Sequence, residues 1–348
     1  MIQPLVSISM ITYNHARYIG RAIEGVLAQK TDFPIELVIG EDCSTDGTRE
    51  IVLEYKEKYP EMIRTVISDE NVGARANSDR TIRACQGKYI AFCEGDDYWV
   101  DPLKLQKQVD FLEANPDYGM VHTDYNRFSE ESRTLQKAHH SAEKIPQGDV
   151  YDDLLCINFV ATLTVMVEKR LVIEARTNLG LLSKNWPMGD YPMWLEISRH
   201  AKVGYIKDVT STYRVLPESA SHSTDPMKSF QFSKSRFEIA SYFIDTYGCS
   251  EIRKAKMDVE YHKFLLNSGF LFGDYELAKT GGDFLINSKI GLSWKRKCLI
   301  YLCVRKQGLP VGKMICLAHD LLQSKLFSGR ILLRRMVVNI MGLLPKRT

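Results

Sequence analysis

The sequence predicts an α/β fold with a mostly parallel central sheet, followed by a helical region. In the N-terminal half, short apolar runs alternate with helical patterns, which is typical of βαβ units. From about residue 226 onward the pattern is helical without strand signals. With 348 residues, 45% of them hydrophobic, the chain can bury a full core. We therefore expect a sheet domain over residues 1–225 and a helical region over 226–348.

The expected strands are short apolar runs separated by helices or loops. They cover residues 5–12, 35–41, 63–68, 88–93, 119–125, 159–169, 203–208 and 211–216. Among the helices, residues 46–60 have Asp46 or Thr48 near the N-cap and stop at Pro60. The next helix ends at Gly87. Two later helices are expected, one with Asp101 as N-cap and one over 189–202 that Asp190 opens.

The charge is distributed unevenly along the chain. Residues 289–348 hold thirteen Lys and Arg but a single acid, a net charge of +12, which leaves −9 of the total of +3 on the first 288 residues. A nucleic-acid surface would fit this charge, but no binding motif accompanies it, so no nucleic-acid partner is expected. A solvated helical bundle is the plain alternative. Because Leu, Ile and Met are mixed with the cations, we expect peripheral membrane contact through these basic helices.

Cysteine usage and hydropathy predict a cytoplasmic protein. The eight cysteines show neither CxxC pairs nor zinc spacing, which favours reduced thiols. Polar residues interrupt the first twenty positions, so no secretory signal is expected. The apolar run at 298–304 is far shorter than the roughly 20 residues of a spanning helix. The expected location is the cytoplasm, with the inner face of the plasma membrane as the site of any membrane contact.

An acidic run, CEGDDYW at 93–99, follows the predicted strand at 88–93. Three carboxylates in four positions repel each other by about 1 kcal/mol per pair even in bulk water. Ligands bind at this edge of open α/β sheets, and hard oxygen ligands suit Mg²⁺ or Mn²⁺ bound to a diphosphate. No GxGxxG follows the first predicted strand, which disfavours a dinucleotide-binding protein. Neither GxxxxGK[ST] nor GxSxG occurs, which disfavours a P-loop NTPase and an α/β-hydrolase.

Several motifs occur in a fixed order: VSISMITYNHARYIGRAIEGVLAQ, ELVIGEDCSTDGT, NVG, GKYIAFCEGDDYW and DPLKLQKQVDFL. Together, over residues 4–222, they resemble an inverting family two glycosyltransferase of the GT-A fold, of the bacterial type that decorates cell-surface polysaccharides. The resemblance implies a metal-dependent hexosyltransferase that uses a nucleoside-diphosphate sugar, most simply a UDP-sugar. The implied acceptor is a hydroxyl of a glycan or lipid-linked oligosaccharide in polysaccharide or lipopolysaccharide biosynthesis.

The resemblance also implies donor-binding residues. Thr12 and Asn14 would line the nucleotide pocket, and Asp42 would accept the N3–H of the base. Arg75 is the candidate for a diphosphate or base contact, with Arg80 close behind.

The acidic run takes the place of the DxD signature of the family. Glu94, Gly95 and Asp96 fall on this signature, and Asp96 and Asp97 would hold the ribose and a Mn²⁺ or Mg²⁺ ion. Glu94 departs from the usual first Asp, because its extra methylene moves the carboxylate outward. His222, in a loop that would close over the donor, is a possible further metal ligand.

Asp190, in MGDYPMW, matches the general base that an inverting transfer needs to take the proton from the acceptor hydroxyl. Each candidate has a plainer explanation. Asp190 would be a natural helix N-cap, and His222 an ordinary loop histidine. A solvated turn would explain Asp96 and Asp97, but Asp101 already caps the following helix. The rival functions are a catalytically inactive nucleotide-sugar-binding protein and a glycoside hydrolase with paired carboxylates.

Overall fold

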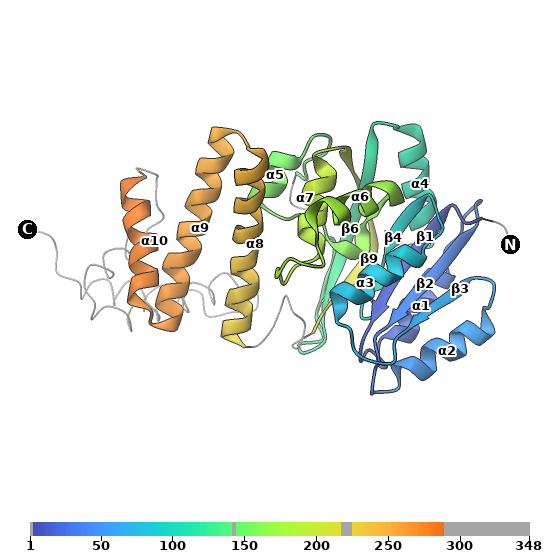
Figure 1. The fold of residues 1–348 in the computed structure, drawn as a ribbon. Helices are drawn as coiled ribbons and strands as arrows, with labels where there is room; N and C mark the ends of the chain where they lie inside the picture. The colour runs from blue at the N-terminus through green and yellow to red at the C-terminus, as the bar shows by residue number, and fades with distance from the viewer. Residues whose placement is uncertain (1–2, 141–143, 217–224, 289–348) are drawn as a thin grey trace, which may run out of the picture. The chain divides into compact units, whose positions relative to one another are not determined.

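The computed structural model describes residues 3–140, 144–216 and 225–288. The chain divides into two compact units, Met1–Gly248 and Cys249–Thr348, which we call the first and the second unit. The first unit contains one mixed sheet with helices packed against it (Figure 1). The predicted α/β class is confirmed.

The sheet of the first unit has the strand order β3-β2-β1-β4-β8-β6-β9-β5, and β7 pairs with β6. The strands β3, β2, β1 and β4 run parallel, β8 is antiparallel to β4 and β6, and β9 is parallel to β6. The bounds are β1 Val6–Thr12, β2 Ile35–Glu41, β3 Ile63–Ile67, β4 Tyr89–Phe92, β5 Tyr98–Trp99, β6 Tyr118–Ser129, β7 Leu135–Gln136, β8 Met166–Glu168 and β9 Lys202–Val215.

Helices connect these strands and cover the sheet. Their bounds are α1 Ile19–Leu27, α2 Thr48–Lys58, α3 Ala74–Ala84, α4 Lys104–Ala114, α5 Tyr151–Cys156, α6 Lys169–Leu179, α7 Asp190–Ser198 and α8 Pro226–Tyr247, with a 3₁₀ turn η1 at Thr162–Thr164. The core follows the alternation of β1: Val6, Ile8 and Met10 are fully buried against Ile19 and Ile23 of α1. This packing fixes the end of β1, from which the site is built.

Two expected elements differ from the structure. Residues 159–169 do not form one strand, because only Met166–Glu168 pairs with neighbours and the preceding residues turn. There the Thr164 hydroxyl donates to the carbonyl of Ala161 (2.6 Å), and such local bonds compete with a sheet. Helix α4 begins at Lys104, because the Asp101 side chain accepts from the amide of Leu103 (2.9 Å) in the turn that precedes the helix.

The predicted boundary at 225/226 coincides with the start of α8, whereas the compact units divide between Gly248 and Cys249. Helix α8 packs on α5 and α7, so it belongs to the first unit. Two strands expected at 203–208 and 211–216 form the single strand β9, with irregular pairing to β6 between them.

The described part of the second unit is a pair of packed helices, α9 Glu251–Phe272 and α10 Tyr275–Asn287. A Cβ on Gly269 would lie 2.3 Å from the amide nitrogen of Ala278, so only glycine permits this close approach. No helix among the described residues is long and apolar enough to span a membrane. Two predictions concern residues outside the described ranges. They are the membrane contact of the basic segment 289–348 and the binding of a metal ion by His222.

Candidate active site

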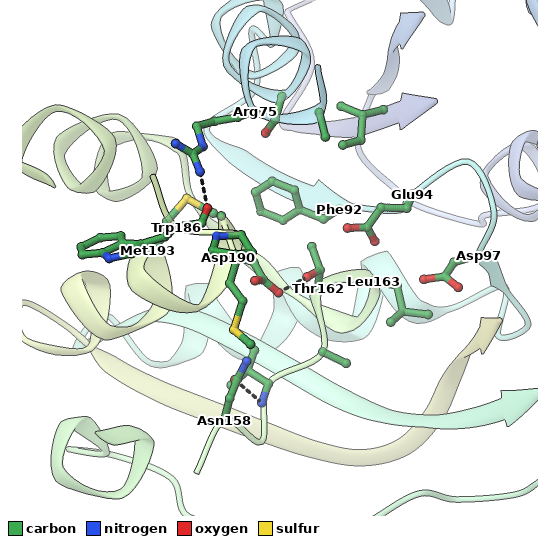
Figure 2. A pocket seen from close by; sticks show the side chains of 18 of the residues that line it. Arg75, Phe92, Glu94, Asp97, Asn158, Thr162, Leu163, Trp186, Asp190 and Met193 are labelled. Carbon is green, nitrogen blue, oxygen red and sulfur yellow. Dashed lines mark hydrogen bonds between the residues drawn. The ribbon is translucent and has the colours of Figure 1, made fainter. Parts of the chain in front are cut away.

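The carboxyl ends of β1 and β4, two of the parallel strands, border a cavity of about 1020 Å³. Residues after β4 form one wall, the segment 158–163, the segment 181–190 and part of α8 form the other, and the start of α3 lies at the rim. Figure 2 shows Glu94 and Asp97 of the first wall and Thr162, Trp186 and Asp190 of the second. The structure brings five of the predicted site residues to this cavity: Arg75, Glu94, Asp96, Asp97 and Asp190. A cavity of this size can hold a large ligand, since small-molecule pockets typically span roughly 300–1,000 Å³.

A tight turn places the carboxylates of the acidic run. The amide of Gly95 donates to the carbonyl of Ile11 (3.0 Å), and the amide of Asp97 donates to the carbonyl of Glu94 (3.0 Å). A Cβ on Gly95 would lie 2.7 Å from Oγ1 and 2.8 Å from Cβ of Thr12. The turn can therefore sit against β1 only if this position is glycine.

The cavity perturbs the acidic side chains strongly. Burial raises the pKa of the Glu94 carboxyl to about 8, and the charges of Asp96 and Asp190 add to this increase. Burial also raises the pKa of Asp97, reinforced by Asp96 and Glu94. A group of carboxyls that is costly to ionise at neutral pH favours the approach of positive charge.

Arg214 of β9 provides a fixed cation behind this group. Its amide donates to Oδ1 of Asp97 (2.7 Å), and its Nε donates to the backbone carbonyl of Asp96 (2.7 Å). The guanidinium forms a buried ion pair with Glu130 and lies 5.1 Å from the ring centroid of Tyr98. Sequence reasoning missed Arg214, because it is a single basic residue on a strand more than a hundred positions away.

The donor set fits a hard divalent cation that receives its other ligands from substrate. Glu94 and Asp96 present carboxylates to the cavity, and Asp97 lies beside them. In the described ranges 3–140, 144–216 and 225–288, no three His, Cys, Asp or Glu side chains are arranged to hold a metal ion. Mg²⁺ commonly uses only one or two carboxylates together with substrate phosphates and water, so these residues are compatible with it.

Asp190 faces the acidic run from the opposite wall. It is the first residue of α7, with Gly189 at the N-cap position. Oδ2 accepts the hydroxyl of Thr162 (2.7 Å) and Oδ1 accepts the amide of Tyr191 (2.7 Å). In Figure 2, Glu94 and Asp190 point towards the same space. Thr162 was missed by sequence reasoning, which placed it on a strand.

Helix α7 holds Asp190 rigidly because its other residues are buried. Tyr191 and Trp194 are fully buried, and the Tyr191 hydroxyl donates to the carbonyl of Leu154 (2.9 Å). Trp194 also packs edge-on against Phe92 at the end of β4 (5.6 Å between centroids). Phe92 immediately precedes the acidic run, so this contact links the two walls of the cavity.

Arg75 lies on the rim, where α3 begins. Its guanidinium donates to the backbone carbonyls of Leu181 (3.1 Å), Lys184 and Trp186, and Figure 2 shows the contact with Trp186. These three acceptors belong to the segment that leads into Asp190. The predicted diphosphate or base contact of Arg75 stays a prediction.

Thr12, Asn14 and Asp42 do not line this cavity. Asn14 has a left-handed backbone (φ 55°), and its Oδ1 accepts the amide of Thr45 (2.9 Å). Asp42 is buried and accepts the amides of Val72 and Gly73 (2.9 Å each). These two side chains organise the loops after β1 and β2, and the nucleotide roles of all three residues stay predictions.

Thr12 differs from the other two, because its hydroxyl is buried without a hydrogen-bond partner among the described residues. Arg80 stands close to Asp42, with a nitrogen–oxygen distance of 3.7 Å. It also donates to the backbone carbonyl of Glu41 at the end of β2.

Comparison with known proteins gives consistent matches. Residues 7–167 match the family model described as Glycosyl transferase family 2. An uncharacterized protein of Mycobacterium tuberculosis is 46% identical over 112 residues, which cover 32% of this chain and 32% of that protein. The match thus spans about a third of the length of such mycobacterial relatives. The putative teichuronic acid biosynthesis glycosyltransferase TuaG of Bacillus subtilis is 31% identical over 220 residues, covering 63% of this chain and 82% of TuaG.

Two solved structures share the fold. TarS residues 1–349 of S. aureus, in complex with UDP, has a TM-score of 0.54 at 16% identity and covers 93% of both chains. The mannosyltransferase PcManGT of Pyrobaculum calidifontis, with GDP-Man and Mn²⁺, has a TM-score of 0.54 at 16% identity, over 92% of this chain and 87% of that one.

Proposed function

This chain belongs to glycosyltransferase family 2, and from that premise we propose that it transfers a hexose, with inversion, from a nucleoside-diphosphate sugar to a glycan or lipid-linked acceptor hydroxyl. The observation that carries the proposal is the position of Asp190, which faces the acidic run across one cavity and is oriented by Thr162 (Figure 2). An inverting transfer needs a base on the side of the sugar opposite the leaving diphosphate, and these two walls provide opposite sides.

In the proposed reaction the acceptor oxygen attacks the anomeric carbon while the bond from that carbon to the diphosphate oxygen breaks. The acceptor proton moves to the Asp190 carboxylate, and the diphosphate leaves with the electron pair of the broken bond. Thr162 holds one Asp190 oxygen (2.7 Å), which fixes the direction of the carboxylate. The buried α7 keeps the base in place during the attack.

The proposed cofactor is Mn²⁺ or Mg²⁺, held by Asp96 and Asp97, with Glu94 nearby. When bound, such an ion supplies positive charge that stabilises the departing diphosphate. The raised pKa of Glu94, about 8, and that of Asp97 support this assignment, because burial and mutual repulsion make a cation favourable here.

We propose a UDP-sugar as donor and polysaccharide biosynthesis as the setting. TarS has been solved with UDP and with UDP-GlcNAc, which supports a uridine donor, although PcManGT has been solved with GDP-Man. The name of TuaG, which refers to teichuronic acid biosynthesis, supports the setting. A thermal-shift panel of UDP, GDP and their sugars, with and without Mn²⁺, tests the donor. Selective stabilisation by uridine nucleotides supports the proposal, and a uniform response to all of them contradicts it.

Asp190→Asn tests the catalytic role. We expect transfer to fall by about 10²–10⁴-fold, the usual contribution of a general base, while the affinity for UDP stays near that of the wild type. Asp110→Asn is the matched control, since Asp110 is an exposed Asp of α4 outside the cavity. Full turnover by Asp190→Asn would remove Asp190 from the base role. A wild type that binds UDP with Mn²⁺ yet neither transfers nor hydrolyses any sugar nucleotide would favour the inactive binding protein.

The location at the inner face of the plasma membrane is part of the proposal and depends on the basic segment 289–348. Cosedimentation of the full chain with vesicles of anionic and of neutral lipid tests it. Binding to anionic vesicles that weakens with salt supports membrane contact.

A further inference from the structure

The segment 181–189 connects α6 to α7 without a helix or strand. Several of its residues are exposed, among them Leu182, Ser183 and Asn185. Such a segment would ordinarily have many conformations, because ordering its backbone costs conformational entropy. It ends at Asp190, so its conformation decides where the proposed base lies.

One side chain from the start of α3 organises this segment. The Nη1 of Arg75 donates to the carbonyls of Leu181 (3.1 Å) and Lys184. Its Nη2 donates to the carbonyl of Trp186, the contact drawn in Figure 2. A guanidinium presents several donors in a rigid plane, so one Arg can hold three carbonyls at separate points. Hydrogen bonds from a charged donor are stronger than those between neutral groups.

Arg75 is itself held firmly. It is the second residue of α3, and the loop that leads into α3 is tied to Asp42 through the amides of Val72 and Gly73 (2.9 Å each). From α6, Arg176 pairs with Asp79 of α3 (3.2 Å). The base of the Arg75 side chain is therefore fixed by two independent contacts.

We propose that Arg75 is a positioning residue, which holds the segment 181–189 and thereby places Asp190 opposite the acidic run. This inference rests on the proposed role of Asp190 as base. It differs from the donor contact expected from sequence, because the Arg75 guanidinium already donates to backbone carbonyls of the segment 181–189. Arg75 then acts on turnover through Asp190, and donor binding does not need it.

The test compares donor binding with turnover in Arg75→Lys and Arg75→Gln. UDP affinity with Mn²⁺ is measured by calorimetry, and turnover by hydrolysis or transfer of the nucleotide sugar that stabilises the wild type most. We expect the dissociation constant for UDP to change less than about twofold, and kcat to fall about tenfold or more, with Lys retaining more activity than Gln. Arg83→Met is the control, because Arg83 is also on α3, is 65% exposed and pairs with Asp79. It should leave both quantities unchanged.

Hydrogen exchange of the full chain gives a second readout that needs no substrate. In Arg75→Lys, the amides of residues 182–186, 188 and 189 should exchange about tenfold faster than in the wild type, while those of residues 71–73 should be unaffected.

Three outcomes would overturn the positioning role. The first is a dissociation constant for UDP that rises tenfold with unchanged kcat, which would assign Arg75 to the donor. The second is unchanged exchange at 182–189, and the third is global unfolding of both variants, because the proposed effect is local. A wild type without UDP binding or turnover would instead contradict the proposed function, and the exchange result would still stand.

Discussion

Arg214→Met removes the cation behind the acidic run, and its effect on stability can be worked out from the structure. The Arg214 side chain is 5% exposed and that of its partner Glu130 is 11% exposed. Removing one partner of a buried ion pair costs about 3–5 kcal/mol, because the other charge loses its buried partner. Here, among the described residues, Glu130 would keep only its ion pair with the exposed Arg133. The carbonyl of Asp96 also loses its donor. We expect the free energy of unfolding, measured by urea denaturation, to fall by about 3–5 kcal/mol.

Two further variants show where this loss originates. Replacing both Arg214 and Glu130 by Met should recover most of the stability, because exchanging a buried pair for apolar residues is often neutral. Arg133→Met is the matched control: Arg133 also pairs with Glu130 but is 68% exposed, so we expect a loss of at most about 1 kcal/mol. Two results would refute the explanation that the loss comes from the Glu130 charge without its buried partner. One is a double variant as unstable as Arg214→Met, and the other is a loss below about 1 kcal/mol in Arg214→Met itself.

Three other substitutions test separate parts of the first unit. Gly95→Ala places a Cβ 2.7 Å from Oγ1 of Thr12. Calorimetry should therefore show weaker UDP binding, and urea denaturation should show that the free energy of unfolding falls by about 1–3 kcal/mol. Wild-type values in both measurements would contradict the close approach. Thr162→Val removes the hydroxyl that donates to Asp190 (2.7 Å), so kcat should fall roughly 10–100-fold while UDP affinity stays unchanged. An unchanged kcat would show that Asp190 does not need this hydrogen bond. His122 is buried, and burial lowers its pKa in the folded chain to about 3. As the pH falls below about 6.5, the unfolded chain is therefore protonated at His122 before the folded chain is. The free energy of unfolding falls as the pH drops from about 6.5 towards 3. His122→Leu should therefore reduce the loss of unfolding free energy between pH 7 and pH 4.5 by about 3 kcal/mol, and an identical acid profile would place the sensitivity elsewhere.

The parallel part of the fold could be predicted because its signal is local. Strands β1, β2 and β4 lie within one residue of the expected ranges, since each is a short apolar run between clear helical patterns. The acidic run and Asp190 were likewise found through short motifs, and the structure places them on one cavity. In each case the information lies within about ten consecutive residues.

The second half of the first unit was harder to predict, because apolar composition alone does not separate strand from turn. Residues 159–169 are as apolar as a buried strand, yet Thr162–Thr164 forms a 3₁₀ turn. The indole nitrogen of Trp99 donates to the carbonyl of Leu163 (3.0 Å), a contact that no local pattern reveals. That turn is what brings the Thr162 hydroxyl to Asp190, so the error concealed a residue that orients the proposed base.

The side chains that orient the site leave little trace in sequence for a more general reason. Arg75 and Arg214 use backbone carbonyls as acceptors, those of Leu181 and Asp96 among them. Every residue type has such a carbonyl, so the identity of the residue at position 181 does not reveal the contact. Carboxylates that carry the proposed chemistry need particular residue types and therefore form motifs. The contacts that orient them need only a backbone in the right place, and only the fold can show them.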